Sequence, residues 1–287
     1  INECKPGVID RDRDQIVGHE QLRKLGELGF MGMMVDPKYG GSGMDTLSYV
    51  LAMEEISKID ASISVAMSVN NSLVCWGLES FGSEEQKQKY LVPLATGQKV
   101  GAFCLSEPEA GSDATSQRTT AIDNGDHYIL NGTKNWITNG STASTYLVIA
   151  QTDTDKGHRG INAFIVEKGW PGFEISAKED KLGIRGSDTH TLVFNDADSS
   201  MGVEEIKDPV FCRTPFGLSA VNPARGLRSD HDYVYQEANI ALATKNKNFS
   251  SGSLVGPSPI NFIVAHGENF FIDSETKLKI AHILDAE

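Results

Sequence analysis

The apolar positions of the first hundred residues recur at the spacing of α-helices. Leucines occupy every third position over residues 22–28, which predicts one helix. Asp45 can cap a second helix that runs to about Lys58. An apolar stretch over residues 61–81 ends at Gly82, a residue typical of helix termination. The pattern therefore predicts a series of helices.

Two local motifs predict where helices begin and end within this region. Ser83 and Gln86 have the spacing of a capping box, which predicts that another helix begins in the segment SEEQKQKYLVPL, residues 83–94. The glycine-rich segment DPKYGGSGMD, residues 36–45, predicts a loop between helices. We expect residues 1–97 to form an N-terminal helical domain.

From Val100 onward the pattern changes to short, alternating segments rich in β-branched residues. Seven segments are typical of strands: 117–122, 127–130, 134–138, 145–151, 161–167, 173–176 and 190–195. The pair Asn131-Gly132 predicts a hairpin turn between two of them. So many short strands in so few residues indicate a small β-barrel or sandwich over residues 98–198. The fold class expected is therefore α+β, with a helical domain followed by a middle β domain.

After Asp198 the periodicity weakens. Residues 199–287 contain an apolar stretch at 259–272 and a possible terminal helix at 277–284, but proline, glycine, serine and asparagine interrupt them. This tail stays unassigned by its pattern.

Composition narrows the classes of function. The chain has 287 residues and a formal net charge of −13, which argues against a nucleic-acid-binding surface because such surfaces are basic. No apolar run reaches the length of a membrane span, so we expect a soluble protein. The chain opens at Ile1 with a polar run, so no signal peptide is visible and the true start is expected to be missing. Its four cysteines show no metal-ligand spacing and are interpreted as free thiols in a reducing compartment: Cys4, Cys75, Cys104 and Cys212.

The segment LSEPEAGSDA, residues 105–114, suits neither a helix nor a strand. Small residues let backbone amides approach a ligand, and Gly111 with Ser112 could hold a pyrophosphate. The alternative is a plain connection between a helix and a strand with turn chemistry.

A second segment, NGTKNWITNG at residues 131–140, carries an aromatic ring among polar neighbours. Trp136 could stack against a planar cofactor, while Thr138, two residues later on the same face of a strand, offers a hydrogen bond. The alternative is a half-buried tryptophan that packs against the helical domain.

Several long strings in fixed order resemble one family. AFCLSEPEAGSDA, LNGTKNWITNG and KEDKLGIRGSDTHTLVFND, together with the upstream strings YGGSGMD, MEEISKIDAS, SVNNSL and FGSEEQKQKYLVPLATG, look like the acyl-CoA dehydrogenase family, most like its short-chain (butyryl-CoA) branch. The resemblance covers about residues 1–198. It implies a helical domain and a middle β-barrel domain with a flavin bound where they meet.

The resemblance also implies roles for individual residues. FAD would be bound by eight residues: Phe103, Leu105, Ser106, Gly111, Ser112, Trp136, Ile137 and Thr138. Among these, Ser112 would reach the pyrophosphate and also contact substrate, and Trp136 would lie beside the isoalloxazine ring. Two nearby carboxylates, Glu107 and Glu109, are interpreted as structural or solvent-facing, because a carboxylate would oppose the reduced flavin.

The reaction implied is the α,β-dehydrogenation of a short or branched acyl-CoA thioester to the enoyl-CoA, a step of fatty acid β-oxidation. A carboxylate base removes the α-proton while FAD accepts hydride, and electrons pass to an electron-transferring flavoprotein. Family members work as homo-oligomers, usually tetramers, in the mitochondrial matrix or the bacterial cytoplasm. Two alternatives are a non-catalytic fragment that binds flavin or acyl-CoA, and an acyl-CoA oxidase.

In this family the catalytic base lies in a C-terminal helical bundle that the tail does not match. Glutamates 204, 205, 237 and 268 are expected to be surface charges, and no catalytic residue is assigned. His231, between two aspartates, and His266 are weak candidates for metal ligands, and no metal site is expected. The tail is interpreted as the product of a frameshift, a recombination or an incomplete gene, because its periodicity is broken; the alternative is a diverged third domain.

Overall fold

The computed structural model describes residues 2–125, 127–198 and 204–206. By their internal contacts the residues fall into two units, Ile1–Gly111 with Thr115–Asp208, and Ser112–Ala114 with Pro209–Glu287. Apart from Ala114, every helix and strand described below belongs to the first unit. The stretches 259–272 and 277–284 lie outside the described residues, as do His231, Glu237, His266 and Glu268. Glu204 and Glu205 belong to a described strand that pairs with residues 163–165.

Helices dominate the first hundred residues, as the sequence predicts. The α-helices are α1 (Val8–Asp14), α2 (His19–Glu27), α3 (Thr46–Ser57), α4 (Ala61–Ser68), α5 (Trp76–Phe81), α6 (Glu84–Gln86) and α7 (Val92–Ala95). Between them lie the 3-10 turns η1 (Phe30–Gly32) and η2 (Pro37–Tyr39) and the π-helical segments η3 (Val69–Cys75) and η4 (Lys87–Leu91).

The predicted helix starts are confirmed by their caps. The carboxylate of Asp45 accepts a hydrogen bond from the Ser48 amide at 2.8 Å at the start of α3. Ser83 and Gln86 form the reciprocal capping box, with bonds of 3.0 and 3.2 Å, at the start of α6. Each cap satisfies amides that lack a partner within the helix, which is why the local sequence determines these boundaries.

Two details differ from the expected helical pattern. The segment 36–45 is mostly loop, but Pro37–Tyr39 form a 3-10 turn whose first free amide is capped by Asp36. The apolar stretch 61–81 runs through α4, η3 and α5, with a π-helical segment in its middle. There Asn70, which is buried, donates to the carbonyl of Met31 at 2.8 Å and accepts from the amide of Gly101 at 2.8 Å.

The second part of the chain forms one curled sheet. Its strands are β1 (Gly101–Cys104), β2 (Thr120–Asp123), β3 (Tyr128–Thr138), β4 (Thr145–Gln151), β5 (Ile161–Glu167), β6 (Phe173–Lys178), β7 (Thr189–Asp198) and β8 (Glu204–Ile206). They lie in the order β6-β7-β3-β2-β4-β5-β8, and β1 pairs in parallel with β4. The remaining 3-10 turns are η5 (Ala114–Ser116) and η6 (Thr154–Gly160).

The hairpin predicted at Asn131-Gly132 is wrong. Residues 127–130 and 134–138 belong to one strand, β3, which continues through this pair alongside β7 with a shift of register between Leu130 and Gly132. The turn instead joins β2 to β3, where the Asn124 amide donates to the carbonyl of His127 at 2.8 Å. Gly132 is needed for another reason: its φ is 147°, and a Cβ there would lie 2.5 Å from Thr119 Oγ1.

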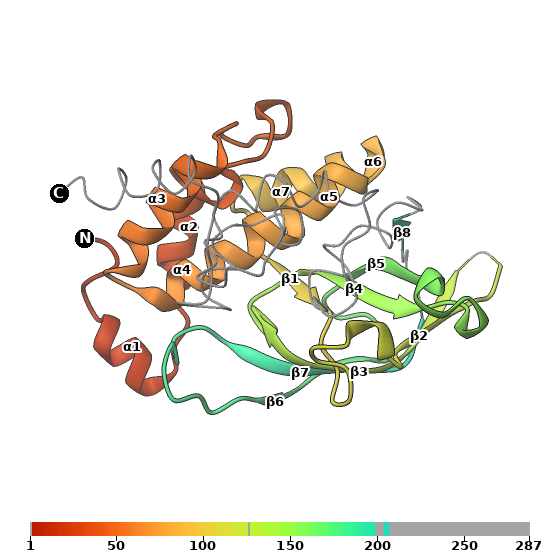
Figure 1. Ribbon diagram of the computed structural model, residues 1–287. Helices are drawn as coiled ribbons and strands as arrows, with labels where there is room; N and C mark the ends of the chain where they lie inside the picture. The colour runs from red at the N-terminus through yellow and green to blue at the C-terminus, as the bar shows by residue number, and fades with distance from the viewer. Residues whose placement is uncertain (1, 126, 199–203, 207–287) are drawn as a thin grey trace, which may run out of the picture. The chain divides into compact units, whose positions relative to one another are not determined.

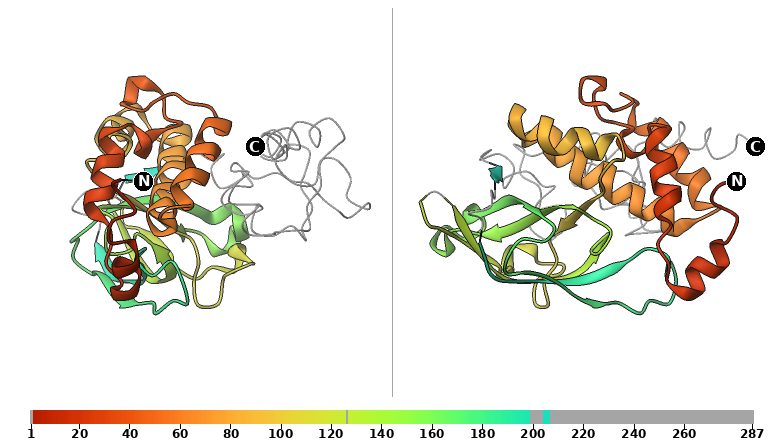
Figure 2. Two further views of the ribbon diagram at one scale, coloured as in Figure 1. Left: turned by 90° about the vertical axis from the view of Figure 1, so that its left-hand side faces the viewer. Right: turned by 180° about the vertical axis from the view of Figure 1, so that it is seen from behind.

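The core of the sheet is rich in aromatic rings. Phe173 stacks on Phe194 with ring centroids 5.0 Å apart, and Tyr146 meets Phe173 edge-on at 4.8 Å. Strand β1 contacts η3, so the first strand lies beside the helical part. In Figures 1 and 2 helices α2 to α7 lie along one side of the sheet, which is drawn mostly in green to teal. Helix α1 lies apart from them, beside the connection between β6 and β7, where the Arg185 amide donates to Asp12 at 2.7 Å.

Three of the four cysteines fall in the described part and are free thiols, as expected: Cys4, Cys75 and Cys104. Cys212 lies outside it. Among the described helices, none combines the length and the apolar character needed to cross a membrane.

Candidate functional site

The candidate residues of the first segment lie at the end of β1. Phe103 is the third residue of this strand and pairs with Leu147 of β4; it is half-buried. Leu105 and Ser106 follow directly and are also half-buried. The Ser106 carbonyl accepts a hydrogen bond from the Asn135 amide of β3 at 2.8 Å. Strand β3 therefore holds this edge next to the second candidate segment.

Trp136 occupies an irregularity of β3. The pairing between β3 and β7 shifts register between Lys134 and Ile137, and Trp136 has a φ of 59°. A bulky residue with positive φ is uncommon, and such strain is typical of functional positions. The indole is 60% exposed. The alternative of a half-buried tryptophan packed on the helical domain is therefore wrong.

The two residues after Trp136 point in different directions. The side chain of Ile137 is buried in the core of the sheet, so its backbone alone is left for a ligand. Thr138 is half-buried and pairs with Thr189 of β7. Because of the register shift, the simple alternation expected from the sequence does not hold across this segment.

The segment 105–114 contains a tight turn. The amide of Glu107 donates to the carbonyl of Ala110 at 3.0 Å, and the reverse bond is 3.2 Å. It connects strand β1 to strand β2, so the expected connection from a helix is wrong. Gly111 is exposed, and no atom of the described residues would lie within 4 Å of a Cβ added there. This open space suits close approach of a ligand to the backbone. Ser112 is exposed and falls in the second unit.

The two carboxylates of this segment are both paired. Glu107 is buried, and its Oε1 lies 2.6 Å from Nζ of the buried Lys134. Glu109 is exposed and forms an ion pair with Arg118 at 2.6 Å. This agrees with the interpretation of both as structural or solvent-facing: Glu107 is buried in an ion pair, and Glu109 is exposed. The role of Lys134 as the partner of Glu107 is not among the expectations from the sequence. The signal for it is a single lysine between the apolar Leu130 and Ile137 of one strand, because a buried lysine needs an acidic partner.

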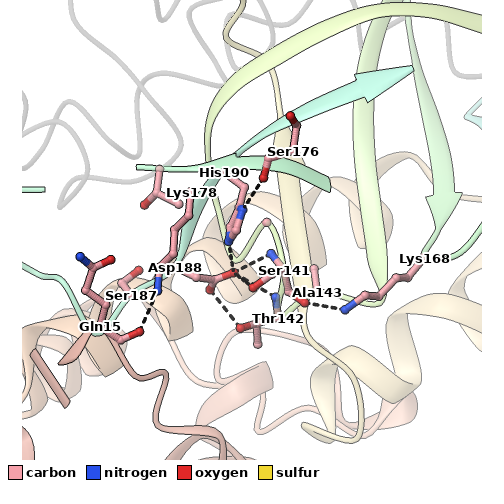
Figure 3. Close-up of polar contacts among 12 residues, drawn as sticks. Gln15, Ser141, Thr142, Ala143, Lys168, Ser176, Lys178, Ser187, Asp188 and His190 are labelled. Carbon is pink, nitrogen blue, oxygen red and sulfur yellow. Dashed lines mark hydrogen bonds and ion pairs between the residues drawn. The ribbon is translucent and has the colours of Figure 1, made fainter. Parts of the chain in front are cut away.

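A second polar cluster holds the turn that follows β3 (Figure 3). Asp188, which is buried, accepts bonds from the amide and hydroxyl of Ser141 at 2.6 and 2.8 Å. It also accepts from the amide and hydroxyl of Thr142, both at 3.0 Å. His190 lies 4.0 Å away and contacts the Ser176 carbonyl through Nδ1 at 3.1 Å. Residues 141–142 and 188–190 are far apart in the chain, so no local motif of the sequence indicates this cluster.

These features fit a planar aromatic ligand better than a metal ion. Within residues 2–125, 127–198 and 204–206, no three His, Cys, Asp or Glu side chains gather to hold a metal. Instead, the exposed indole of Trp136, on a backbone with positive φ, lies beside the half-buried end of β1. Gly111, around whose Cα the described residues leave free space, follows this strand in the chain. An aromatic ring stacks well on such an indole, and backbone amides near a glycine suit phosphate oxygens.

Comparison with known proteins gives the family. The family described as "Acyl-CoA dehydrogenase, N-terminal domain" matches residues 1–98, and "Acyl-CoA dehydrogenase, middle domain" matches residues 102–197. The short-chain specific acyl-CoA dehydrogenase of Clostridium acetobutylicum is 49% identical over 195 residues, covering 68% of this chain and 52% of that protein. The chain thus spans about half the length of the curated relatives it matches.

Solved structures agree. Butyryl-CoA dehydrogenase from Megasphaera elsdenii aligns with a TM-score of 0.69 and 37% identity, covering 98% of this chain and 73% of that one. A chain from the structure described as the electron transferring flavoprotein of Acidaminococcus fermentans aligns with a TM-score of 0.71 and 38% identity, with coverage of 98% and 73%. Fold, matched domains and relatives lead to one conclusion: the chain belongs to the acyl-CoA dehydrogenase family.

Proposed function

We propose that this chain is the N-terminal and middle part of an FAD-dependent acyl-CoA dehydrogenase, which converts a short or branched acyl-CoA to the enoyl-CoA. The observation that carries the proposal is the exposed indole of Trp136, on a strained backbone beside the end of β1. Membership of the family and the identity to short-chain specific relatives support the substrate class.

The flavin would lie along the edge formed by Phe103, Leu105 and Ser106, with Trp136 stacked beside its ring. Thr138 would donate a hydrogen bond to the ring, while Ile137, whose side chain is buried in the core, would contribute its backbone. The amides around Gly111 and the hydroxyl of Ser112 would hold the pyrophosphate, and Ser112 would also contact the substrate. These assignments rest on the resemblance and on the exposure of the residues concerned.

When bound, FAD supplies the hydride acceptor for the β-carbon of the acyl chain. The contribution of the described residues is to bind and orient: the half-buried strand end and the indole hold a flat ring in place. Glu107 is committed to Lys134, and the exposed Glu109 to Arg118, so neither is proposed as the base that removes the α-proton. No catalytic residue is assigned.

The wider setting follows from the family. We propose domains at residues 1–97 and 98–198, with residues 199–287 unassigned, and a homo-oligomer as the assembly. An electron-transferring flavoprotein would accept the electrons, a proposal supported by the similarity to a chain from the Acidaminococcus fermentans structure. The compartment would be the bacterial cytoplasm or the mitochondrial matrix.

The test is the visible absorption spectrum of the purified full chain after incubation with FAD and removal of the free cofactor. Butyryl-CoA is then added without oxygen. A retained flavin band that bleaches supports the dehydrogenase. A retained band that stays oxidised would reduce the proposal to a flavin-binding protein, and a chain that retains no FAD would overturn it.

A further inference from the structure

Lys134 and Glu107 form an ion pair that is shielded from water. The side chain of Lys134 is 0% exposed and that of Glu107 is 5% exposed, with Nζ and Oε1 2.6 Å apart. Taking two charges out of water is expensive, and similar stability is often reached with apolar side chains of the same size. Stability alone therefore does not explain why this part of the chain has a buried ion pair.

All three protons of the Lys134 ammonium have an acceptor. Nζ donates to the Leu105 carbonyl at 3.0 Å, to Glu107 at 2.6 Å and to Gln117 Oε1 at 3.2 Å. An ammonium group has three donors and no acceptor, so its hydrogen bonding is complete. Burial lowers the pKa of Lys134, and the Glu107 carboxylate counteracts this effect. The three acceptors around Nζ match the three donors of the charged form.

Glu107 is equally well satisfied. In addition to Lys134, its carboxylate accepts from the Arg118 amide at 2.5 Å and from the Thr119 amide at 3.1 Å. Burial opposes ionisation, but Lys134 and these hydrogen bonds outweigh it and lower the pKa of the Glu107 carboxyl. The carboxylate is thus ionised at neutral pH and joins β3 to the two residues that precede β2.

The pair acts on the edge that carries the candidate flavin contacts. The Lys134 ammonium donates a hydrogen bond to the Leu105 carbonyl. The amide of the next residue, Asn135, donates a hydrogen bond to the Ser106 carbonyl at 2.8 Å. Trp136 follows at once, at the register shift of β3. The carbonyls of Leu105 and Ser106, directly after β1, therefore accept hydrogen bonds from Lys134 and Asn135. These two donors directly precede the exposed Trp136 in the chain.

We propose that the buried Lys134–Glu107 pair is a positioning element for the cofactor: it sets Leu105 and Ser106 against Trp136 so that both sides of one flavin-binding edge keep their spacing. This inference rests on the proposed function. Lys134 and Glu107 act through the Leu105 carbonyl and the backbone of β3 and contact no reacting atom.

The test uses the full chain and three variants, Lys134→Met, Glu107→Gln and the double variant. Each single variant leaves one buried charge without its partner and should unfold at lower temperature. The double variant removes both charges at similar volume, so its melting temperature should recover toward that of the unmodified chain. Its Leu105 carbonyl still lacks a donor, and we expect its Kd for FAD to stay about tenfold higher than that of the unmodified chain.

A second readout does not depend on flavin. Hydrogen exchange at the Asn135 amide, which donates to Ser106, should be about tenfold faster in the double variant without FAD. Glu109→Gln is the matched control, because it removes a carboxylate from the same turn but from an exposed ion pair. It should leave the Kd for FAD and the exchange rate unchanged.

Each outcome is decisive. Recovered stability with weak FAD binding and fast exchange at Asn135 supports positioning. A double variant that binds FAD as tightly as the unmodified chain, or that fails to fold, would overturn it in favour of a purely structural pair. If the unmodified chain binds no FAD, the proposed function fails, and the exchange rate at Asn135 still shows whether the pair holds the edge.

Discussion

The side-chain amide of Asn139 donates a hydrogen bond to the carbonyl of Ala66 at 3.1 Å, and thereby joins the turn after β3 to helix α4. The same amide donates to the Gly101 carbonyl at 3.0 Å, at the start of β1. Asn139 is buried and has a φ of 63°. One side chain therefore links the helical part, the first strand and the strand that carries Trp136.

Two substitutions of Asn139 should distinguish how much its hydrogen bonds and its positive φ each contribute to the free energy of unfolding. Asn139→Ala loses both bonds and also places Ala at positive φ, so we expect a loss of about 2–4 kcal/mol in the free energy of unfolding. Asn139→Gly loses the same bonds but tolerates the φ, and should be about 1 kcal/mol less destabilising than the Ala variant. Urea denaturation followed by circular dichroism measures both; equal losses would show that the positive φ carries no cost.

Trp136 should matter for the cofactor and little for stability. Because the indole is 60% exposed, Trp136→Ala should change the free energy of unfolding by no more than about 0.5 kcal/mol. It should weaken FAD binding by about threefold to tenfold, the range expected for one aromatic pair. A fluorescence titration of FAD gives the Kd.

Trp170 provides the matched control for that experiment. It belongs to the core of the sheet, so Trp170→Ala should cost about 3–5 kcal/mol of stability. Should Trp136→Ala instead destabilise the chain as much as Trp170→Ala, the indole would be part of the packing rather than a ligand surface.

Asp188 should stabilise the turn at Ser141 and Thr142. Asp188→Ala leaves four donors without their acceptor, and we expect a loss of about 1.5–3 kcal/mol in the free energy of unfolding. Asp188→Asn keeps one side-chain oxygen as an acceptor and should lose less. Thermal unfolding of both variants measures the difference, and an Asn variant as unstable as the Ala variant would contradict the role of the remaining oxygen.

Glu107 should make the free energy of unfolding fall at acidic pH. Its pKa in the folded chain lies below the ordinary value of 4.5, because Lys134 and the hydrogen bonds from Arg118 and Thr119 outweigh burial. Its stabilisation is therefore fully present above pH 4.5 and is lost as the pH falls through the lowered pKa. We expect the free energy of unfolding of Glu107→Gln to fall less steeply than that of the unmodified chain below this pH.

Urea denaturation at a series of pH values measures the two slopes. Glu109→Gln, which changes the same charge on an exposed side chain, is the control and should keep the slope of the unmodified chain. Parallel slopes for Glu107→Gln and the unmodified chain would mean that Glu107 gains nothing from its pairing.

Local chemistry explains what could be predicted from the sequence. Asp45 and the Ser83–Gln86 box place helix starts correctly, because a cap involves only residues within one turn. The change from helical to strand periodicity near Val100 is a property of each segment and was also correct. The family strings lie within these segments, so the resemblance could be identified without coordinates.

Tertiary contacts decided the rest. Asn131-Gly132 has the composition of a hairpin, yet β7, more than sixty residues further along, pairs with this segment and keeps it extended. The exposure of Trp136 depends on the shifted register of that same pairing. Glu107 became a buried structural carboxylate because Lys134, 27 residues away, neutralises it. The local sequence sets conformational preferences, but burial, register and ion pairing depend on which distant strand lies alongside.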